Sequence, residues 1–253
     1  MDMRVIQVPN AQEMNRWAAA HIIQLVQTQP PSVLGFATGS TPEGIYRELV
    51  ADHRQNGTSY KEVVTFNLDE YVGLKRDHPN SYHTYMQTRL FDHLDCVSHR
   101  THIPAGDATD LAAECHRYEQ QISRYGGIDL QLLGIGRNGH IGFNEPGTSF
   151  DSRTHVVKLT ESTRNANAHF FQRKEEIPTH AITMGIASIL SSRQILLLAA
   201  GHTKAEAIAR LIEGPVDADF PASALKQHSD VTVLADESAC QHLAKKGKIF
   251  DVG

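Results

Sequence analysis

The chain has 253 residues, of which 40% are hydrophobic and 21% are charged, a composition that excludes the disordered and fibrous classes. Its formal net charge is −5 and its isoelectric point about 6.3, so neither nucleic acid nor an anionic membrane surface is favoured as a partner.

Short apolar runs alternate along the chain with longer segments of helical periodicity. Most of the short runs are continuously apolar, which is typical of parallel strands covered on both faces. We expect strands at Arg4–Val8, Ser32–Ala37, Val63–Asn67, Leu130–Ile135, His155–Leu159, Gln194–Ala199 and Val231–Ala235. We expect helices at Ala11–Gln27, Pro42–His53, Ser81–His93, Leu111–Arg124, Ser162–Arg173, Met184–Leu190, Lys204–Glu213 and Glu237–Lys245.

This alternation predicts one domain over residues 1–253, an α/β fold with three α/β/α layers around a mostly parallel, Rossmann-like sheet. No low-complexity tract, linker-like composition or clear repeat divides the chain. Sheets of this class place their sites beyond the carboxyl ends of the strands. We therefore expect the functional residues to lie where the predicted strands end.

The cysteines are widely spaced, odd in number and without a CxxC pair, which favours free thiols in a reducing cytoplasm. They are Cys96, Cys115 and Cys240. The N-terminal MDMRVIQVPN has no long apolar core, so we expect no signal peptide, and the apolar run Ile195–Ala200 is too short to span a bilayer. His99 and His102 have no nearby carboxylate or cysteine to complete a ligand set, and no metal site is predicted.

The stretch GFATGSTPEGIYREL carries the first predicted site. The strand runs into Gly39, Ser40 and Thr41, with Thr41 suited to be the helix N-cap and Pro42 the first helical residue. Free amides, hydroxyls and the positive end of the helix dipole predict a phosphate site there. The Walker spacing is absent, and a simple strand–turn–helix cap is the alternative.

Two further strand ends carry acids and a histidine. In VVTFNLDEYVGL, Asp69 and Glu70 lie at the end of the predicted strand. This pattern fits two interpretations equally well: a carboxylate that transfers a proton, or a capped loop with two solvated acids. GIGRNGHIGFNEPG begins as a G-x-G-x-x-G dinucleotide pattern, and Glu161 lies where a ribose-binding acid would. No helical period follows it, however, so we expect a tight loop that points His140 into a site, with Glu145 orienting the imidazole.

The stretch GHTK, after Gln194–Ala199, forms another strand, turn and helix start. Lys204 in this stretch can supply a point charge to a phosphate, although a single lysine at such a place is usually only solvated.

The blocks ATGSTP, TFNLDEYVGL, SYHTYM, GIGRNGHIGFNEPG, SRTHVVKLTESTRNANAHFF and GHTKAEAI together resemble the glucosamine-6-phosphate deaminase family, over nearly the whole chain. The resemblance implies a cytoplasmic enzyme that turns an amino sugar phosphate, glucosamine 6-phosphate, and water into fructose 6-phosphate and ammonia without a cofactor. It implies that His140 opens the sugar ring, that Glu145 tunes His140, and that Asp69 moves a proton from C2 to C1. Phosphate binding is implied for Gly39, Ser40, Thr41 and Lys204.

The chain departs from well-known members of the family at several positions. Asn138 stands where those members have aspartate, so the basicity of His140 should depend more on Glu145. His169 stands where they have a phosphate-binding arginine, which predicts weaker phosphate binding above neutral pH. The short tail, ending in KKGKIFDVG, and Val157 in place of a basic residue predict a monomer with little allosteric activation.

Three other functions remain open at this stage. A 6-phosphogluconolactonase would share the phosphate loop but would not need a proton shuttle such as Asp69. A galactosamine-6-phosphate deaminase acts on a substrate that differs in the stereochemistry of one hydroxyl group. The sequence barely distinguishes this enzyme from a glucosamine-6-phosphate deaminase. A non-catalytic sugar-phosphate sensor domain would normally be joined to a DNA-binding helix-turn-helix, and only three residues precede the first strand.

Overall fold

The structure is a computed structural model that describes residues 3–161, 163–164, 171, 177–244 and 249–251. A central sheet contains the strands β1 (Arg4–Val8), β2 (Val33–Phe36), β3 (Val64–Asn67), β5 (Thr101–His102), β6 (Leu130–Gly134), β9 (Gln194–Ala199), β10 (Val231–Asp236) and β11 (Ile249–Asp251). Their order across the sheet is β11-β1-β10-β9-β6-β2-β3-β5, and the described pairings are parallel. The predicted mostly parallel sheet is therefore confirmed.

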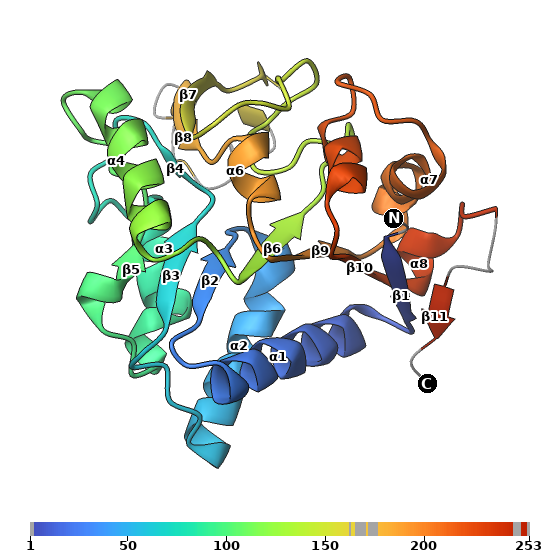
Figure 1. Ribbon diagram of the computed structural model, residues 1–253, viewed down its shortest axis with the longest axis horizontal. Helices are drawn as coiled ribbons and strands as arrows, with labels where there is room; N and C mark the ends of the chain where they lie inside the picture. Colours follow the sequence, from blue (N-terminus) through green and yellow to red (C-terminus); the bar gives the residue numbers. More distant parts are fainter. Residues whose placement is uncertain (1–2, 162, 165–170, 172–176, 245–248, 252–253) are drawn as a thin grey trace.

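Helices cover both faces of this sheet. They are α1 (Ala11–Thr28), α2 (Ser40–Asn56), α3 (Tyr82–Arg89), α4 (Leu111–Arg124), α6 (Ile186–Leu190), α7 (Ala205–Glu213) and α8 (Glu237–Cys240), with 3-10 turns η1 (Phe91–His93), η2 (Ser98–Arg100), η5 (His202–Lys204) and η6 (Pro221–Gln227). Figure 1 shows α1 and α2 below the strands and α6 and α7 above them. The three layers predicted from the sequence are present.

The two faces of the sheet pack into separate hydrophobic clusters because successive strand residues point to opposite sides. Leu34 and Phe36 join the cluster that holds α1, α2 and α3. Val33 lies in the other cluster, with residues of α4, α6, α7 and α8. Burial on both faces explains why the strands read as continuous apolar runs rather than as alternating ones.

A second, smaller sheet was not predicted. It consists of β4 (Asp69–Tyr71), β8 (His180–Thr183) and β7 (His155–Lys158), paired antiparallel in that order. It lies above the main sheet in Figure 1. The sequence predicted β7 but assigned it no separate sheet, and β4 and β8 are only three and four residues long. Strands this short leave almost no periodic signal.

Several predicted boundaries are corrected. Helix α2 begins at Ser40, so Gly39 is its N-cap, not Thr41, and Pro42 is its third residue rather than its first. Helix α8 ends at Cys240, well before the predicted end at Lys245. The helix predicted for Ser162–Arg173 lies largely outside the described residues.

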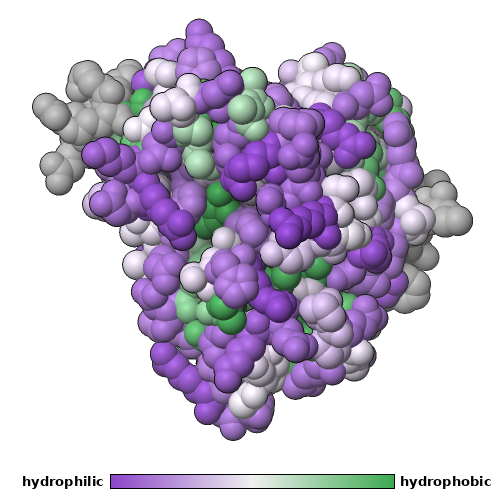
Figure 2. Space-filling model, turned by 60° about the vertical axis from the view of Figure 1, so that its left-hand side comes forward, coloured by the Kyte–Doolittle hydropathy of each residue, from purple (hydrophilic) through white to green (hydrophobic). Residues whose placement is uncertain are grey.

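The face drawn in Figure 2 is mainly hydrophilic, with small hydrophobic patches scattered over it. None of the helices in the described ranges combines the length and apolar character needed to cross a membrane. Among the described residues, Cys96, Cys115 and Cys240 form no disulfide bond, as the sequence predicted.

Candidate active site

The strand ends singled out in the sequence belong to four adjacent strands, in the order β9, β6, β2 and β3. Because these strands are parallel, their carboxyl ends meet at one edge of the sheet. That edge therefore holds the segment leading to Lys204, the loop with His140, the loop with Gly39 and the connection to Asp69. The topology gathers all four predicted site segments along one line.

The connection from β2 to α2 depends on the backbone of Gly39. Its φ of 94° and ψ of −173° lie in a region that is essentially restricted to glycine. Gly39 makes no side-chain capping bond to α2, and the first amides of a helix have no acceptor within the helix. The amides of Ser40 and Thr41 are therefore available to an anion at the positive end of the helix dipole.

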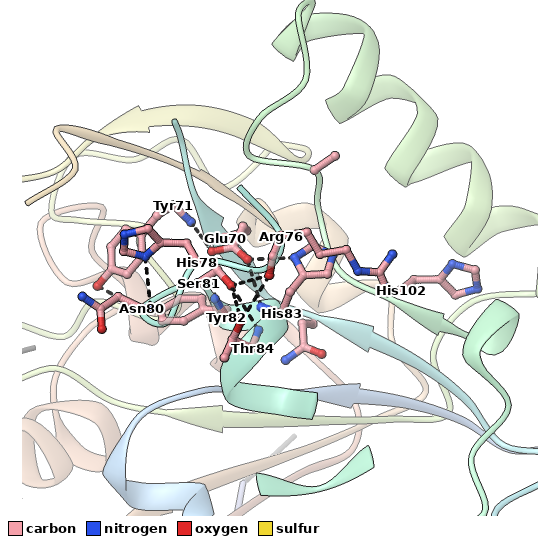
Figure 3. A network of polar contacts seen from close by, with 12 residues as sticks. Glu70, Tyr71, Arg76, His78, Asn80, Ser81, Tyr82, His83, Thr84 and His102 are labelled. Atoms are coloured by element: carbon pink, nitrogen blue, oxygen red, sulfur yellow. Dashed lines mark hydrogen bonds and ion pairs between the residues drawn. The ribbon is translucent and has the colours of Figure 1, made fainter. Parts of the chain in front are cut away.

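Asp69 and Glu70 are adjacent in β4 but serve different surroundings. Glu70 accepts hydrogen bonds from the backbone amides of Tyr82 and His83 at 3.0 Å each and from Nδ1 of His83 at 2.9 Å (Figure 3). It also accepts from the amide of Tyr71 at 2.8 Å. Glu70 is therefore a buried structural acid that fixes the start of α3 to β4, which is neither the proton-transfer group nor the solvated acid that the sequence offered.

Asp69 has the properties of a proton-transfer group. Its residue is only 6% exposed, and burial, followed by the nearby charge of Glu70, raises the pKa of its carboxyl group to about 8. A methyl group placed on Gly142 would lie 3.7 Å from Oδ2 of Asp69. The carboxylate thus faces the loop that carries His140, and it is poised to gain or lose a proton near neutral pH.

His140 and Glu145 are joined through Asn138. Nδ1 of His140 lies 2.7 Å from Oδ1 of Asn138, and Nδ2 of Asn138 donates to Oε2 of Glu145 at 2.6 Å. The direct distance from Nδ1 of His140 to Oε2 of Glu145 is 3.7 Å. Glu145 accepts the Asn138 amide, so Oδ1 faces His140, Nδ1 carries the proton, and Nε2 is left as the base. Asn138 therefore contacts the imidazole, and Glu145 orients the imidazole through that amide.

The loop from β6 packs the imidazole against its own backbone. A methyl group on Gly136 would lie 2.2 Å from Cε1 of the His140 ring, so only glycine leaves room for it. Burial lowers the pKa of His140, the charge of Glu145 opposes that effect, and the charge of Lys204 adds to it. The chain continues from this loop to β7 without forming a helix. That observation confirms the prediction that the glycine pattern is not a dinucleotide loop.

Lys204 lies beside the His140 loop. Its Nζ donates to the carbonyl oxygen of Ile135 at 2.6 Å. Burial lowers the pKa of Lys204, and the nearby charge of Arg137 lowers it further. Within the described part of the chain this partly buried ammonium group bonds to a neutral oxygen, which favours an anion as its next partner. His169, the remaining predicted phosphate ligand, lies outside the described residues.

Three residues that had no predicted role stabilise this arrangement. Thr163 donates its hydroxyl to Oε1 of Glu145 at 2.8 Å. Buried Asn144 donates to the carbonyl oxygens of Ile141 and Met184 at 2.9 Å each, which ties the His140 loop to the end of β8. The hydroxyl of Thr183, opposite Asp69 in the small sheet, accepts from the amide of Phe143. Among the described residues, no cluster of His, Cys, Asp and Glu is arranged to hold a metal ion.

Comparison with known proteins gives a consistent result. The family model for glucosamine-6-phosphate isomerases and 6-phosphogluconolactonases matches residues 9–234. The glucosamine-6-phosphate deaminase of Halalkalibacterium halodurans is 55% identical, covering 96% of this chain and 98% of the relative. The glucosamine-6-phosphate deaminase of Geobacillus sp. (strain WCH70) is 59% identical, covering 94% of each.

Solved structures agree with these relatives. A monomeric glucosamine-6-phosphate deaminase aligns with a TM-score of 0.92 and 54% identity, covering 94% of this chain and 99% of that one. A 6-phosphogluconolactonase from Trypanosoma cruzi aligns with a TM-score of 0.77 but only 18% identity, covering 97% of this chain and 99% of that one, which shows a common fold alone. The chain belongs to the family of glucosamine-6-phosphate isomerases and 6-phosphogluconolactonases.

Proposed function

We propose that this protein is a glucosamine-6-phosphate deaminase, which converts glucosamine 6-phosphate and water into fructose 6-phosphate and ammonia. The observation that carries the proposal is a buried carboxyl group, Asp69, with a pKa of about 8, facing a loop whose histidine is oriented by an amide and a carboxylate. Identities of 52–59% to relatives bearing that name support the assignment.

His140 would open the sugar ring. With Nδ1 hydrogen-bonded to Asn138, Nε2 is the nitrogen left to exchange a proton between the anomeric hydroxyl and the ring oxygen. Glu145, acting through Asn138, would stabilise the imidazolium that forms when Nε2 takes the proton. The product of this step is the open-chain amino aldose.

Asp69 would then move one proton between adjacent carbons. In its ionised form it removes the proton from C2, and it returns that proton to C1. The amino aldose becomes a ketose imine equivalent, and water hydrolyses the C2–nitrogen bond to release ammonia. The sequence of an isomerisation and a hydrolysis has no net oxidation or reduction and requires no redox cofactor.

The phosphate of the substrate would be bound by the amides and hydroxyls of Ser40 and Thr41 beside Gly39, with Lys204 as a charged donor and His169 as a further ligand. The uncapped start of α2 and the partly buried ammonium group of Lys204 support these roles. The monomeric state of the similar solved enzyme supports a monomer here, and the cysteines, which form no disulfide bond among the described residues, are compatible with a cytoplasmic location.

Ammonia release by the purified protein tests the proposal. We expect glucosamine 6-phosphate to yield ammonia and fructose 6-phosphate, and an Asp69→Asn variant to yield little of either. Galactosamine 6-phosphate, tested in parallel, separates the two epimeric substrates. Hydrolysis of 6-phosphogluconolactone without ammonia release would instead identify a lactonase, and binding of glucosamine 6-phosphate without turnover would identify a sensor.

A further inference from the structure

Tyr85, on the second turn of α3, contacts the loop that precedes α2. Its hydroxyl donates a hydrogen bond of 2.6 Å to the carbonyl oxygen of Gly39. We propose that Tyr85 is a positioning residue for phosphate binding, which holds the Gly39–Ser40 peptide in the orientation that an anion requires. This inference rests on the proposed function, since it assigns a new residue to the same site.

The peptide that Tyr85 contacts is the one whose orientation matters most. In a trans peptide the carbonyl and amide bonds point in opposite directions. Fixing the carbonyl of Gly39 toward Tyr85 therefore turns the amide of Ser40 away from α3. That amide is the first of α2, and no capping side chain of Gly39 occupies it.

Gly39 needs such an external contact because it cannot hold its own conformation. Glycine has no side chain to limit its backbone, and its positive φ of 94° is one of many conformations open to it. The cap residues of α1, α3 and α4, in contrast, bond their own helices through their side chains. Tyr85 replaces that local restraint with a contact from another helix.

Tyr85 is itself held in a fixed place. The first turn of α3 is anchored at two points: Glu70 accepts from the amides of Tyr82 and His83, and Ser81 accepts from the amide of Thr84 (Figure 3). Because Glu70 is adjacent to Asp69 in β4, α3 connects the carboxylate that moves the proton to the loop that binds the phosphate. Tyr85 lies at the loop end of this connection.

The hydroxyl of Tyr85 remains a donor at every relevant pH. Burial raises its pKa above the ordinary value, and the nearby charge of Glu43 raises it further. The bond to Gly39 therefore does not titrate with the catalytic groups. Loss of the hydroxyl should weaken phosphate binding by the same factor across the neutral range.

A Tyr85→Phe variant of the full chain tests the inference, because it removes the hydroxyl and keeps the ring. We expect KM for glucosamine 6-phosphate to rise about 2- to 10-fold, which corresponds to one hydrogen bond, with kcat changed less than twofold. The affinity for inorganic phosphate, measured by the phosphate-induced rise in Tm, should fall by a similar factor. The pH dependence of kcat should keep its shape.

A Tyr118→Phe variant is the matched control. The hydroxyl of Tyr118 also donates to backbone carbonyls, those of Asn67 at 2.7 Å and His102 at 3.2 Å, but it is fully buried and these bonds lie at the ends of β3 and β5. We expect it to lower Tm without changing the affinity for inorganic phosphate.

Three results would overturn the inference. They are an unchanged KM and phosphate affinity in Tyr85→Phe, a fall in Tm alone, or an equal loss of phosphate affinity in Tyr118→Phe. The proposed function fails separately. If the wild type releases no ammonia but still binds inorganic phosphate more tightly than Tyr85→Phe, the reaction is wrong and the role of Tyr85 stands.

Discussion

His140 and Glu145 lie 3.7 Å apart, measured from Nδ1 to the carboxylate, and the side-chain amide of Asn138 bonds to both and bridges them. The amide accepts from the ring and donates to the acid, so its orientation is fixed at both ends. Glu145 therefore acts on His140 in two ways. It orients the imidazole through Asn138, and its charge opposes the lowering of the His140 pKa by burial.

Replacing Asn138 by alanine should separate His140 from Glu145. We expect kcat to fall about 10- to 100-fold because the tautomer and orientation of the imidazole are no longer fixed, with little change in affinity for inorganic phosphate. Steady-state kinetics and the phosphate-induced rise in Tm measure the two effects. A Thr163→Val variant, which removes a contact of Glu145 but leaves Asn138 in place, should lose less activity. Wild-type kcat in Asn138→Ala would contradict the bridge.

A Gly136→Ala variant should displace His140 without straining the backbone. The added methyl group would lie 2.2 Å from the ring, whereas a methyl group on Gly134 would have no atom within 4 Å. Neither glycine has a positive φ. We expect Gly136→Ala to lose at least tenfold in kcat and Gly134→Ala to keep nearly all of it. Equal activity of the two variants would show that the imidazole position does not matter.

Lys204→Met should weaken binding of the phosphate group. Losing a charged donor predicts a rise in KM of about 10- to 100-fold. The pKa of His140 should also rise, because the charge of Lys204 lowers it in the wild type. Lys158→Met is the control, since it makes the same change in net charge at an exposed residue of β7. A similar rise in KM in both variants would point to long-range attraction instead of a specific contact.

The kcat/KM of the wild type should rise with pH, reach half its maximum near pH 8 and level off above that pH. Asp69 must be ionised to remove the proton from C2, and its pKa of about 8 means that the ionised fraction falls tenfold per unit below that pH. The phosphate group of the substrate ionises near pH 6, so its titration is separate. A profile of kcat/KM that is flat from pH 6.5 to 8.5 would rule out Asp69 as the base in this form.

Asp69→Asn should stabilise the fold while removing the activity. The folded-state pKa of about 8 lies above the ordinary value of 3.8, so the protonated form is favoured in the folded state. The stability associated with this group is fully present below about pH 4 and is lost as the pH rises to about 8. The Tm of the variant should therefore exceed that of the wild type by a margin that grows over this range and then stays constant. A margin independent of pH would contradict the raised pKa.

The sequence predicted the elements that depend on local signals. The bounds of β1, β9 and α4 match the expected ranges. Short, largely apolar runs and a helical pattern that extends over 14 residues are strong local signals. Candidate residues at strand ends were found for a topological reason: parallel strands in neighbouring positions end at one edge. This rule explains why the structure places four predicted site residues along that edge, namely Gly39, Asp69, His140 and Lys204.

Other features depend on contacts between distant segments and could not be read locally. The sequence left open whether Asp69 and Glu70 supply a proton-transfer carboxylate or are solvated acids. The structural role of Glu70 could not be predicted, because it depends on α3, whose first residue lies twelve positions after Glu70. The start of α2 was misplaced because Thr41 and Pro42 have strong local preferences, while the glycine conformation at Gly39 is supported by Tyr85 from another helix.

The proposed site divides its tasks between two sheets. Phosphate binding belongs to the large parallel sheet, through the loops after β2 and β9, whereas Asp69 belongs to the small antiparallel sheet with β7 and β8. Mutations that shift the small sheet can therefore change the proton transfer between C2 and C1 while binding of the phosphate group stays intact. A fold built in this way allows new reactions on phosphorylated sugars to evolve by repositioning a few short strands, without changing the phosphate-binding site.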